Sequence, residues 1–430
     1  RSASHETPEK KSRKRRPLVT LARSSLLVVA ASLIAGVVSY LFNPLLIAPR
    51  LGAEGIAILG AALSLYSAFT FPHRPIALTV IRYVSHYQAM DKPGSAANVI
   101  IRSFRKLLIF GTLALILLGF TSPALAHFLN LKSVWPVLGG LFLAYLGLFQ
   151  TVAFFSLQGL LRFNPFAAAF MADPVARILT GLILLGVGLT VPAVLIAYMT
   201  GFVVSIGLGC WYLKDLLFYR EKGAVDRTEI YRYGIPTFFF SLYTALVLSA
   251  DGLMAKHYFS DFDAGIYFAA ATLSKILLAV FLPLAFASFS HMSDAASRKT
   301  DARLLFRKTL LMVLGLCIAF GSVFFLIPSL IIKLTYGSSF ASAGPLLGIS
   351  CLALIPVVIT QIYSHYCLAL KQYGFLYGLM GGVTIRLVLI MRYHQDWYQL
   401  IYASLAGGIA EIILAIVTNR MGREKLKEIS

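Results

Sequence analysis

The chain has 430 residues, of which 58% are hydrophobic and only 13% are charged. Soluble globular domains carry about 25% charged residues, so this chain cannot cover a water-exposed surface. The composition therefore excludes an ordinary soluble protein and indicates an integral membrane protein. The net charge of +20 reflects many Lys and Arg residues, and their distribution along the chain indicates on which side of the membrane each connection lies.

The membrane crossings are predicted from long uncharged runs. Between Arg23 and Arg50 lie 26 uncharged residues, and between Lys106 and Lys132 lie 25. A hydrocarbon core of about 30 Å needs about 20 helical residues, so each of these runs can cross once. Each crossing has to be helical, because lipid offers no hydrogen-bond partner to the backbone.

Two runs are too long for one crossing, and each contains a cluster of helix-breaking residues, at 186–192 and at 336–345. Splitting both runs there predicts an all-α polytopic membrane protein with about twelve transmembrane helices. The predicted helices, in chain order, are 22–48, 54–86, 104–128, 133–161, 164–187, 190–218, 228–257, 264–293, 305–334, 342–370, 373–391 and 397–419.

The basic residues predict the orientation. When the N-terminus is placed in the cytoplasm, 29 of the 38 Lys and Arg residues fall on the cytoplasmic side and five on the other. This bias follows the positive-inside rule, so we expect both termini to be cytoplasmic. Residues 1–20 are predicted to be a basic tail, and its run 10–16 suits anionic lipid better than nucleic acid. The five outer residues are Arg50, Lys132, Lys256, Lys333 and Arg392.

An internal repeat divides the chain into two parts. Three short matches occur in the same order, 55–64 with 265–274, 104–108 with 306–310, and 136–139 with 345–348, at offsets of 210, 202 and 209. They predict two six-helix halves, 21–221 and 222–430, which share one orientation in the membrane. Parallel repeats of this kind occur in transporters, which bind substrate between the repeats and work by alternating access.

Several segments resemble one known family. They are 51–65 (LGAEGIAILGAALSL), 77–85 (ALTVIRYVS), 157–163 (LQGLLRF), 250–254 (ADGLM), 264–267 (AGIY) and 336–347 (YGSSFASAGPLL). They resemble the polysaccharide-biosynthesis flippases, also called Wzx-type, of the multidrug/oligosaccharidyl-lipid/polysaccharide exporter superfamily. The resemblance covers most of residues 20–375. One departure is the segment 71–75 (FPHRP), where relatives carry a glycine-bearing apolar stretch.

The resemblance implies two six-helix bundles arranged as a V. It also implies that the chain moves undecaprenyl-diphosphate-linked oligosaccharide from the cytoplasmic to the periplasmic leaflet of a bacterial inner membrane, by alternating access and without covalent chemistry. The implied partners are this lipid-linked glycan and membrane lipids, with a polysaccharide polymerase and export machinery as further candidates. No cofactor is expected beyond a coupling ion, Na+ or H+, and no nucleic acid is expected.

Ionisable residues inside the predicted helices are the candidates for substrate binding. A diphosphate cannot cross hydrocarbon unaided, because burying an unpaired charge is very costly, so the protein has to supply fixed cations. The candidate cations are Arg74, Arg177, Lys275 and Arg386. The candidate carboxylates, for pairing or for a coupling ion, are Asp173, Asp251 and Glu411.

Arg74 lies between Pro72 and Pro75, which are expected to kink the helix and to form a gate. Lys275 lies in the repeat-equivalent helix, so these two cations could clamp a diphosphate across the pseudo-twofold axis. The alternative for Arg74 is a structural role, in which it reaches toward water or pairs with Asp251.

The other pairs also have a structural alternative. Asp173 and Arg177 are four residues apart on one helix face, so a self-neutralising pair is favoured. Arg386 and Glu411, on the last two predicted helices, could pair likewise. Alternatively, Glu411 could bind a coupling cation or a proton.

The balance of charges bears on the substrate. Asp251 is predicted to pair with Lys256, or else to help bind a coupling cation. The predicted helices hold four cations against three carboxylates, which suits an anionic substrate. A cation-coupled multidrug exporter of the same superfamily remains the alternative among transporters, and such exporters usually rely on buried carboxylates to bind cations.

A membrane-bound glycan polymerase or ligase is the alternative of a different class, and a scaffold for polysaccharide assembly is another. Such enzymes generally need a large periplasmic loop with Arg or His, whereas the predicted outer loops are mostly under fifteen residues long. The sequence also shows no catalytic constellation, no Walker motif and no metal-ligand spacing of Cys and His. We therefore expect a transporter and not an enzyme.

Overall fold

The computed structural model describes residues 34–36, 38, 39, 41–188, 190–219, 223, 228–278, 281, 288, 292 and 301–429, with the side chains at 228–234 and 423–429 outside this description. The predicted tail 1–20 and most of the predicted helix 22–48 lie outside the described residues.

The described part of the chain is built of helices, and it contains no strand. The elements are η1 (Phe42–Ile47), α2 (Ala48–Phe69), α3 (His73–Ala89), α4 (Pro93–Lys106), η2 (Leu107–Gly111), α5 (Thr112–Phe120), α6 (Ser122–Phe128), α7 (Trp135–Gly159), α8 (Phe163–Gly186), α9 (Val191–Tyr212), α10 (Lys214–Leu217), α11 (Thr228–Tyr258), α12 (Asp261–Ser274), α14 (Ala302–Leu326), α15 (Pro328–Thr335), η3 (Ser338–Ala343), α16 (Gly344–Ala369), α17 (Phe375–Arg392) and α18 (Trp397–Ile429).

Ten helices among the described residues are long and apolar enough to cross a membrane. The predicted all-α polytopic fold is therefore confirmed. The predicted helices 22–48 and 264–293 lie partly outside the described residues. Two predicted boundaries were wrong: the helix expected to begin near 104 begins at Pro93, and the last helix, expected to end near 419, continues to Ile429. Proline is well suited to the first turn of a helix, and the sequence analysis treated the basic stretch that begins at Pro93 as part of a connection.

A kink at Gly52 lies between the first two predicted helices. Gly52 lies within α2 but has φ +65° and ψ −174°, so two helical segments meet there. This conformation is strained for any residue with a Cβ atom, which explains the glycine. The predicted helix 54–86 is also divided, because a turn at residues 70–72 separates α2 from α3. Pro72 is the N-cap of α3 and Pro75 lies in its first turn.

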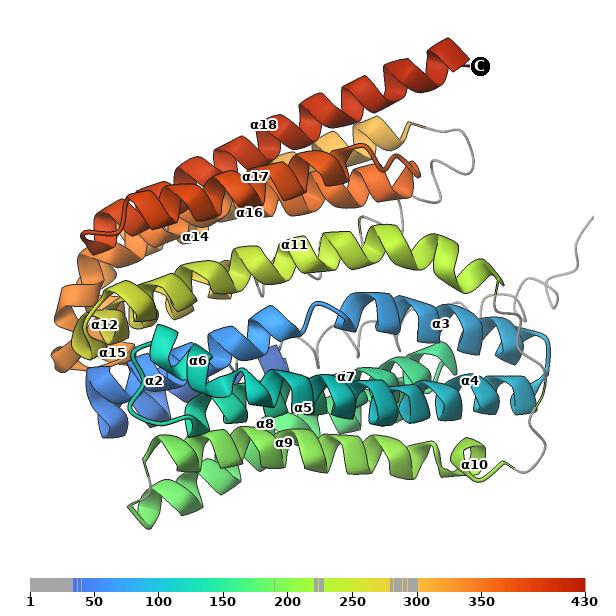
Figure 1. The fold of residues 1–430 in the computed structure, drawn as a ribbon, viewed down its shortest axis with the longest axis horizontal. Helices are drawn as coiled ribbons and strands as arrows, with labels where there is room; N and C mark the ends of the chain where they lie inside the picture. The colour runs from blue at the N-terminus through green and yellow to red at the C-terminus, as the bar shows by residue number, and fades with distance from the viewer. Residues whose placement is uncertain are drawn as a thin grey trace, which may run out of the picture.

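The helices form two groups (Figure 1). Helices α2–α10 belong to the N-terminal half, and α14–α18 belong to the C-terminal half, with α11 running between the two groups. At one end of the molecule, here called the α12 end, α2, α6, α12 and α15 converge. Toward the opposite end, here called the α10 end, α18 diverges from α3 and α4, which gives the molecule the shape of a V.

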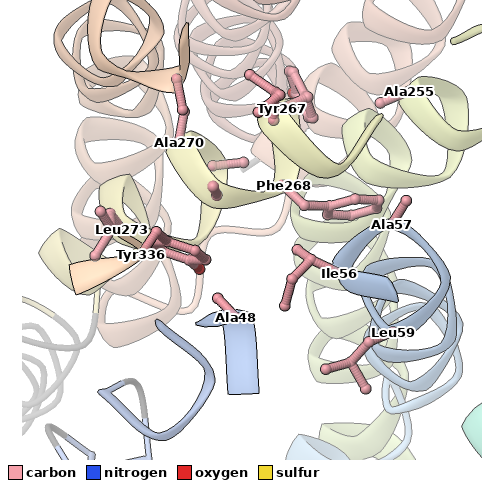
Figure 2. Close-up of a cluster of buried hydrophobic side chains, with 14 of the residues drawn as sticks. Ala48, Ile56, Ala57, Leu59, Ala255, Tyr267, Phe268, Ala270, Leu273 and Tyr336 are labelled. Atoms are coloured by element: carbon pink, nitrogen blue, oxygen red, sulfur yellow. The ribbon is translucent and has the colours of Figure 1, made fainter. Parts of the chain in front are cut away.

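An apolar cluster joins the two halves near the α12 end. Figure 2 shows side chains of α2 facing side chains of α11 and α12, and the labelled residues are Ala48, Ile56, Ala57, Leu59, Ala255, Tyr267, Phe268, Ala270, Leu273 and Tyr336. Two glycines allow this close approach. A Cβ atom added at Gly265 would lie 2.0 Å from the carbonyl oxygen of Ala53, and one added at Gly60 would lie 2.5 Å from the ring of Phe268.

A polar contact joins two connections at the α10 end. The guanidinium of Arg162 donates to the carbonyl oxygen of Tyr212 and to both carboxylate oxygens of Asp215. These hydrogen bonds lower the pKa of Asp215 from its ordinary value. The turn between α7 and α8 is thereby tied to α10, although the pair is partly exposed and is worth at most about 1 kcal/mol.

Helices α17 and α18 pack closely through glycines. A Cβ atom at Gly378 would lie 2.3 Å from the carbonyl oxygen of Leu414, and one at Gly382 would lie 2.6 Å from the Cα atom of Glu411. A Cβ atom at Gly407 of α18 would likewise lie 2.5 Å from the Cβ atom of Arg386. Backbones can approach in this way only where side chains are absent, as is usual for helices that pack within membranes.

This packing predicts a difference between two glycines of the same helix. Gly378→Ala should lower the melting temperature of the purified protein in detergent, because the new methyl group meets the backbone of α18 and overpacking costs about 1–3 kcal/mol. Gly381→Ala is the matched control, since its nearest neighbour is a side-chain atom of Leu414 at 3.7 Å. Equal melting temperatures for the two variants would contradict the close packing.

Candidate functional site

One buried ion pair lies within the N-terminal half. Arg177 and Asp173, both on α8, are joined by an Nη2–Oδ1 contact of 2.5 Å. Gln150 of α7 donates to Asp173 Oδ2 at 3.0 Å and to Ser205 Oγ of α9 at 2.8 Å. The guanidinium also lies 4.1 Å from the ring centre of Tyr198 on α9. The favoured self-neutralising pair is therefore present, and it ties α7, α8 and α9 together.

A second buried pair lies within the C-terminal half. Arg386 of α17 contacts Glu411 of α18 twice, with Nε–Oε1 at 2.7 Å and Nη2–Oε2 at 3.1 Å. The hydroxyl of Tyr243 on α11 donates to the same Oε2 at 2.9 Å. Glu411 has no exposed surface. Its negative charge is balanced by Arg386 through a bidentate contact, which is the strong geometry for a guanidinium and a carboxylate.

The two arginines hold equivalent places in the repeat, which the sequence analysis missed. They differ by 209 residues, which is the offset between the matched segments at Pro136 and Pro345. The same offset relates Thr151 and Thr360, whose hydroxyls each donate to the carbonyl oxygen four residues earlier. Applying this one offset to the charged residues would have revealed the correspondence. Each half thus carries a buried arginine and its carboxylate in the helix pair that ends the half.

A third pair lies on α11 and at the end of α12. Lys275 Nζ donates to the carbonyl oxygen of Leu248 at 2.9 Å and lies 3.4 Å from Asp251 Oδ1. The hydroxyl of Tyr267 donates to Asp251 Oδ2 at 3.1 Å. Asp251 is therefore paired with Lys275, and the expected pairing with Lys256 was wrong, because the ammonium group of Lys256 contacts Asp261 instead.

Lys256 has a different role from the one expected for an outer basic residue. It is completely buried and forms a 2.8 Å ion pair with Asp261, in the first turn of α12. It lies in the last turn of α11 and not in the connection that follows, as was predicted, and the N-terminal half covers this turn. Its ammonium group also donates to the carbonyl oxygens of Leu129 and Asn130.

Arg74 lies at the contact surface between the two halves, here called the seam, where α3 faces α11. Its guanidinium carbon is 5.0 Å from the ring centre of Phe240 on α11. The ring of His365 on α16 packs edge-on against the same Phe240 ring, at 5.5 Å between centroids. Nearby, Phe71 and Phe238 make a second ring contact between the halves, at 5.2 Å. The departure of residues 71–75 from the family pattern thus places a cation among aromatic rings of the other half.

Arg74 and Lys275 approach the same helix at different levels. Arg74 contacts α11 at Phe240 and Lys275 contacts it at Leu248. Eight helical residues span about 12 Å. Both residues therefore line α11, but their contacts are not opposite one another as a symmetric clamp would require. No group of three or more His, Cys, Asp or Glu in the described part of the chain could hold a metal ion.

The Arg386–Glu411 pair predicts non-additive stability. Arg386→Met and Glu411→Gln should each destabilise the protein strongly, since removing one partner of a buried pair costs about 3–5 kcal/mol. The double variant should lose clearly less than the sum of the single losses, because it leaves no buried charge. Thermal unfolding in detergent measures all three, and additive losses would show that the pair does not exist.

The known proteins that the chain is similar to agree with this architecture. An inward-facing multidrug resistance transporter of the MATE family and the MOP superfamily has a TM-score of 0.71 at 15% identity, with 94% of this chain and 98% of that chain covered. The outward-facing form of such a transporter has a TM-score of 0.61 at 16% identity, covering 95% and 96%. The lipid II flippase MurJ, in an inward closed conformation, has a TM-score of 0.62 at 15% identity, covering 93% and 87%.

At such identities these similarities establish the fold alone. A comparison with curated proteins finds no match. The model of one family, described as polysaccharide biosynthesis protein, matches residues 21–296, which is well over half of the chain. The chain is therefore a multi-pass membrane protein with the fold of these transporters and of this flippase, and it belongs to the polysaccharide biosynthesis protein family.

Proposed function

We propose that the chain is a flippase for a lipid-linked oligosaccharide. It moves an undecaprenyl-diphosphate-linked glycan from the cytoplasmic to the periplasmic leaflet of a bacterial inner membrane by alternating access. The observation that carries this proposal is the position of Arg74, on the seam between the two halves and against aromatic rings of the opposite half.

The arrangement around Arg74 suits a phosphate. A guanidinium that lies against a ring keeps its N–H groups in its own plane, where they can donate in pairs to phosphate oxygens. Nearby, the rings of Phe71 and Phe238 are not fully buried and offer apolar faces against which sugar rings can stack, whereas the ring of Phe240 is buried. A lipid diphosphate that carries sugars needs both kinds of contact in one place.

The seam is also where such a substrate has to bind. In transporters with parallel repeats, the substrate lies between the repeats, and rocking exposes it to each side in turn. The pairs Arg177–Asp173 and Arg386–Glu411 lie inside the halves, so they would move as parts of rigid bodies. We assign those two cations to the rigidity of each half, and we assign Arg74 to the substrate.

The other functional assignments follow the same geometry. Asp251 is the better candidate for a coupling Na+ or H+, since its side chain is 15% exposed whereas that of Glu411 is fully buried. The break before Pro72 lets α3 tilt relative to α2, as the proposed gate requires. We place the α10 end in the cytoplasm, because exposed basic residues gather there, namely Arg82, Lys92, Arg105, Lys106 and Lys214.

The multidrug exporters among the similar structures support a second candidate, a drug exporter. Drug exporters of this superfamily typically move cations, and a substrate site that contains Arg74 would repel them. A glycan polymerase or ligase would instead change the covalent structure of the lipid-linked glycan. The two alternatives therefore differ from the proposal in measurable products, which are drug efflux and elongated glycan.

The proposal predicts a defect in cells of the native host. Deletion of the gene should abolish surface polysaccharide and trap its lipid-linked precursor, unchanged in length, in the cytoplasmic leaflet. Wild-type protein should restore export. Arg74→Ala should reduce it about ten- to a hundredfold, the effect of losing a charge-assisted contact of about 1.5–3 kcal/mol. Arg74→Lys should fall between them, since lysine is a point charge.

Arg105→Ala, at the exposed end of α4, is the control for the loss of a basic residue from the same half. It should insert and export like the wild type. Normal export in Arg74→Ala, or normal surface polysaccharide in the deletion strain, would refute the proposal. A precursor that accumulates in a shorter form would favour the polymerase instead.

A further inference from the structure

The turn that follows α6 contacts the last residues of α11. Leu131 N donates to the carbonyl oxygen of Ala126 at 2.9 Å, and Asn130 N donates to that of His127 at 3.1 Å. Asn130 has φ +49°, so this is the ordinary left-handed ending of a helix, which uses two of its last carbonyl groups. The next three carbonyl oxygens point out of the turn and need partners elsewhere.

The C-terminal half supplies those partners. Lys256 Nζ donates to the carbonyl oxygen of Leu129 at 2.8 Å and to that of Asn130 at 3.3 Å. His257 Nδ1 donates to the carbonyl oxygen of Phe128. In return, Asn130 Nδ2 donates to the carbonyl oxygen of His257 at 2.7 Å. Four hydrogen bonds therefore cross between the halves at this one turn.

Lys256 depends on this contact because it is completely buried. An ammonium group has three donors, and here they meet two carbonyl oxygens of the N-terminal half and the carboxylate of Asp261. The end of a helix is also a favourable place for a cation. If the halves part at the α12 end, Lys256 keeps Asp261 and loses both carbonyl oxygens.

Ring stacking reinforces the same contact. The rings of Phe128 and His257 are stacked, with 4.1 Å between centroids and 9° between planes. Leu129 is buried in an apolar cluster that Leu253 of α11 also contacts. Polar and apolar contacts across the seam therefore occur at the same place, where the turn after α6 meets the last turn of α11.

We infer that residues 128–130 together with Lys256 and His257 form a latch that holds the α12 end closed. Release of this latch is a step of the transport cycle, because a substrate bound at the seam can leave toward the α12 end only after the two turns separate. The strength of the latch sets the balance between the closed and the open state. The inference concerns the movement of the halves and holds whichever substrate the seam binds.

The latch can be tested by distances between spin labels in lipid nanodiscs, without any substrate. In a background without the four native cysteines, labels at Lys132 and Gln395 report on the α12 end, and labels at Arg105 and Arg420 report on the α10 end. All four positions are exposed. The wild type should show one short distance for the first pair and a long distance for the second.

Lys256→Met removes the ammonium group and keeps an apolar chain of similar length. It should lengthen the Lys132–Gln395 distance in most molecules and shorten the Arg105–Arg420 distance, because the halves rock as rigid bodies. Lys333→Met is the matched control, since Lys333 is exposed in α15 at the same end, and it should leave both distances unchanged.

A second variant guards against a failure of Lys256→Met to fold. Asn130→Gly retains the left-handed backbone and removes one of the four hydrogen bonds, so it should shift both distances in the same directions by a smaller fraction. Unchanged distances in Lys256→Met, or in Asn130→Gly if the first variant does not fold, would overturn the latch. A longer distance at the α12 end without shortening at the α10 end would also overturn it, as that result means local damage.

Discussion

The cost of placing a charge in hydrocarbon is the constraint on which this structure depends. Three of the four cations predicted inside the membrane are held by carboxylates, in the pairs Arg177–Asp173, Lys275–Asp251 and Arg386–Glu411. A buried pair adds little net stability, but it is costly to break. Each pair therefore fixes the helices that carry it, and the halves gain rigid interiors. Movement is left to the seam, where the contacts are rings, glycines and one latch.

Helix α11 carries the successive parts of this seam along its length. Phe240 meets Arg74 of α3 and Lys256 meets the turn after α6, and both contacts cross between the halves. Between them along the helix, Leu248 and Asp251 contact Lys275 of the same half. Tyr243 joins the same helix to the buried pair of the C-terminal half. A shift of α11 would therefore change the contacts at the proposed substrate site, at the candidate coupling carboxylate and at the latch. This single helix can link ion binding, substrate binding and closure.

Much of the fold could be predicted from the sequence, because uncharged runs and charge bias follow directly from the chemistry of the bilayer. The pair Asp173–Arg177 could be predicted too, since a spacing of four residues puts both on one helix face. Lys256 could not, because no sequence pattern shows that backbone carbonyls of residues 129 and 130 will cover it. The equivalence of Arg177 and Arg386 was less evident because their carboxylate partners differ in position: Asp173 lies on the same helix as Arg177, whereas Glu411 lies on the helix after Arg386.

The central claim is that Arg74 receives the diphosphate of a lipid-linked glycan at the seam. The most direct measurement uses precursor extracted from the deletion strain, reconstituted with purified protein in liposomes, and follows which leaflet exposes the sugar to an added lectin. The account predicts that sugar moves between leaflets with wild-type protein, and more slowly by an order of magnitude or more with Arg74→Ala. Equal rates for the two proteins, or no movement with either, would contradict it.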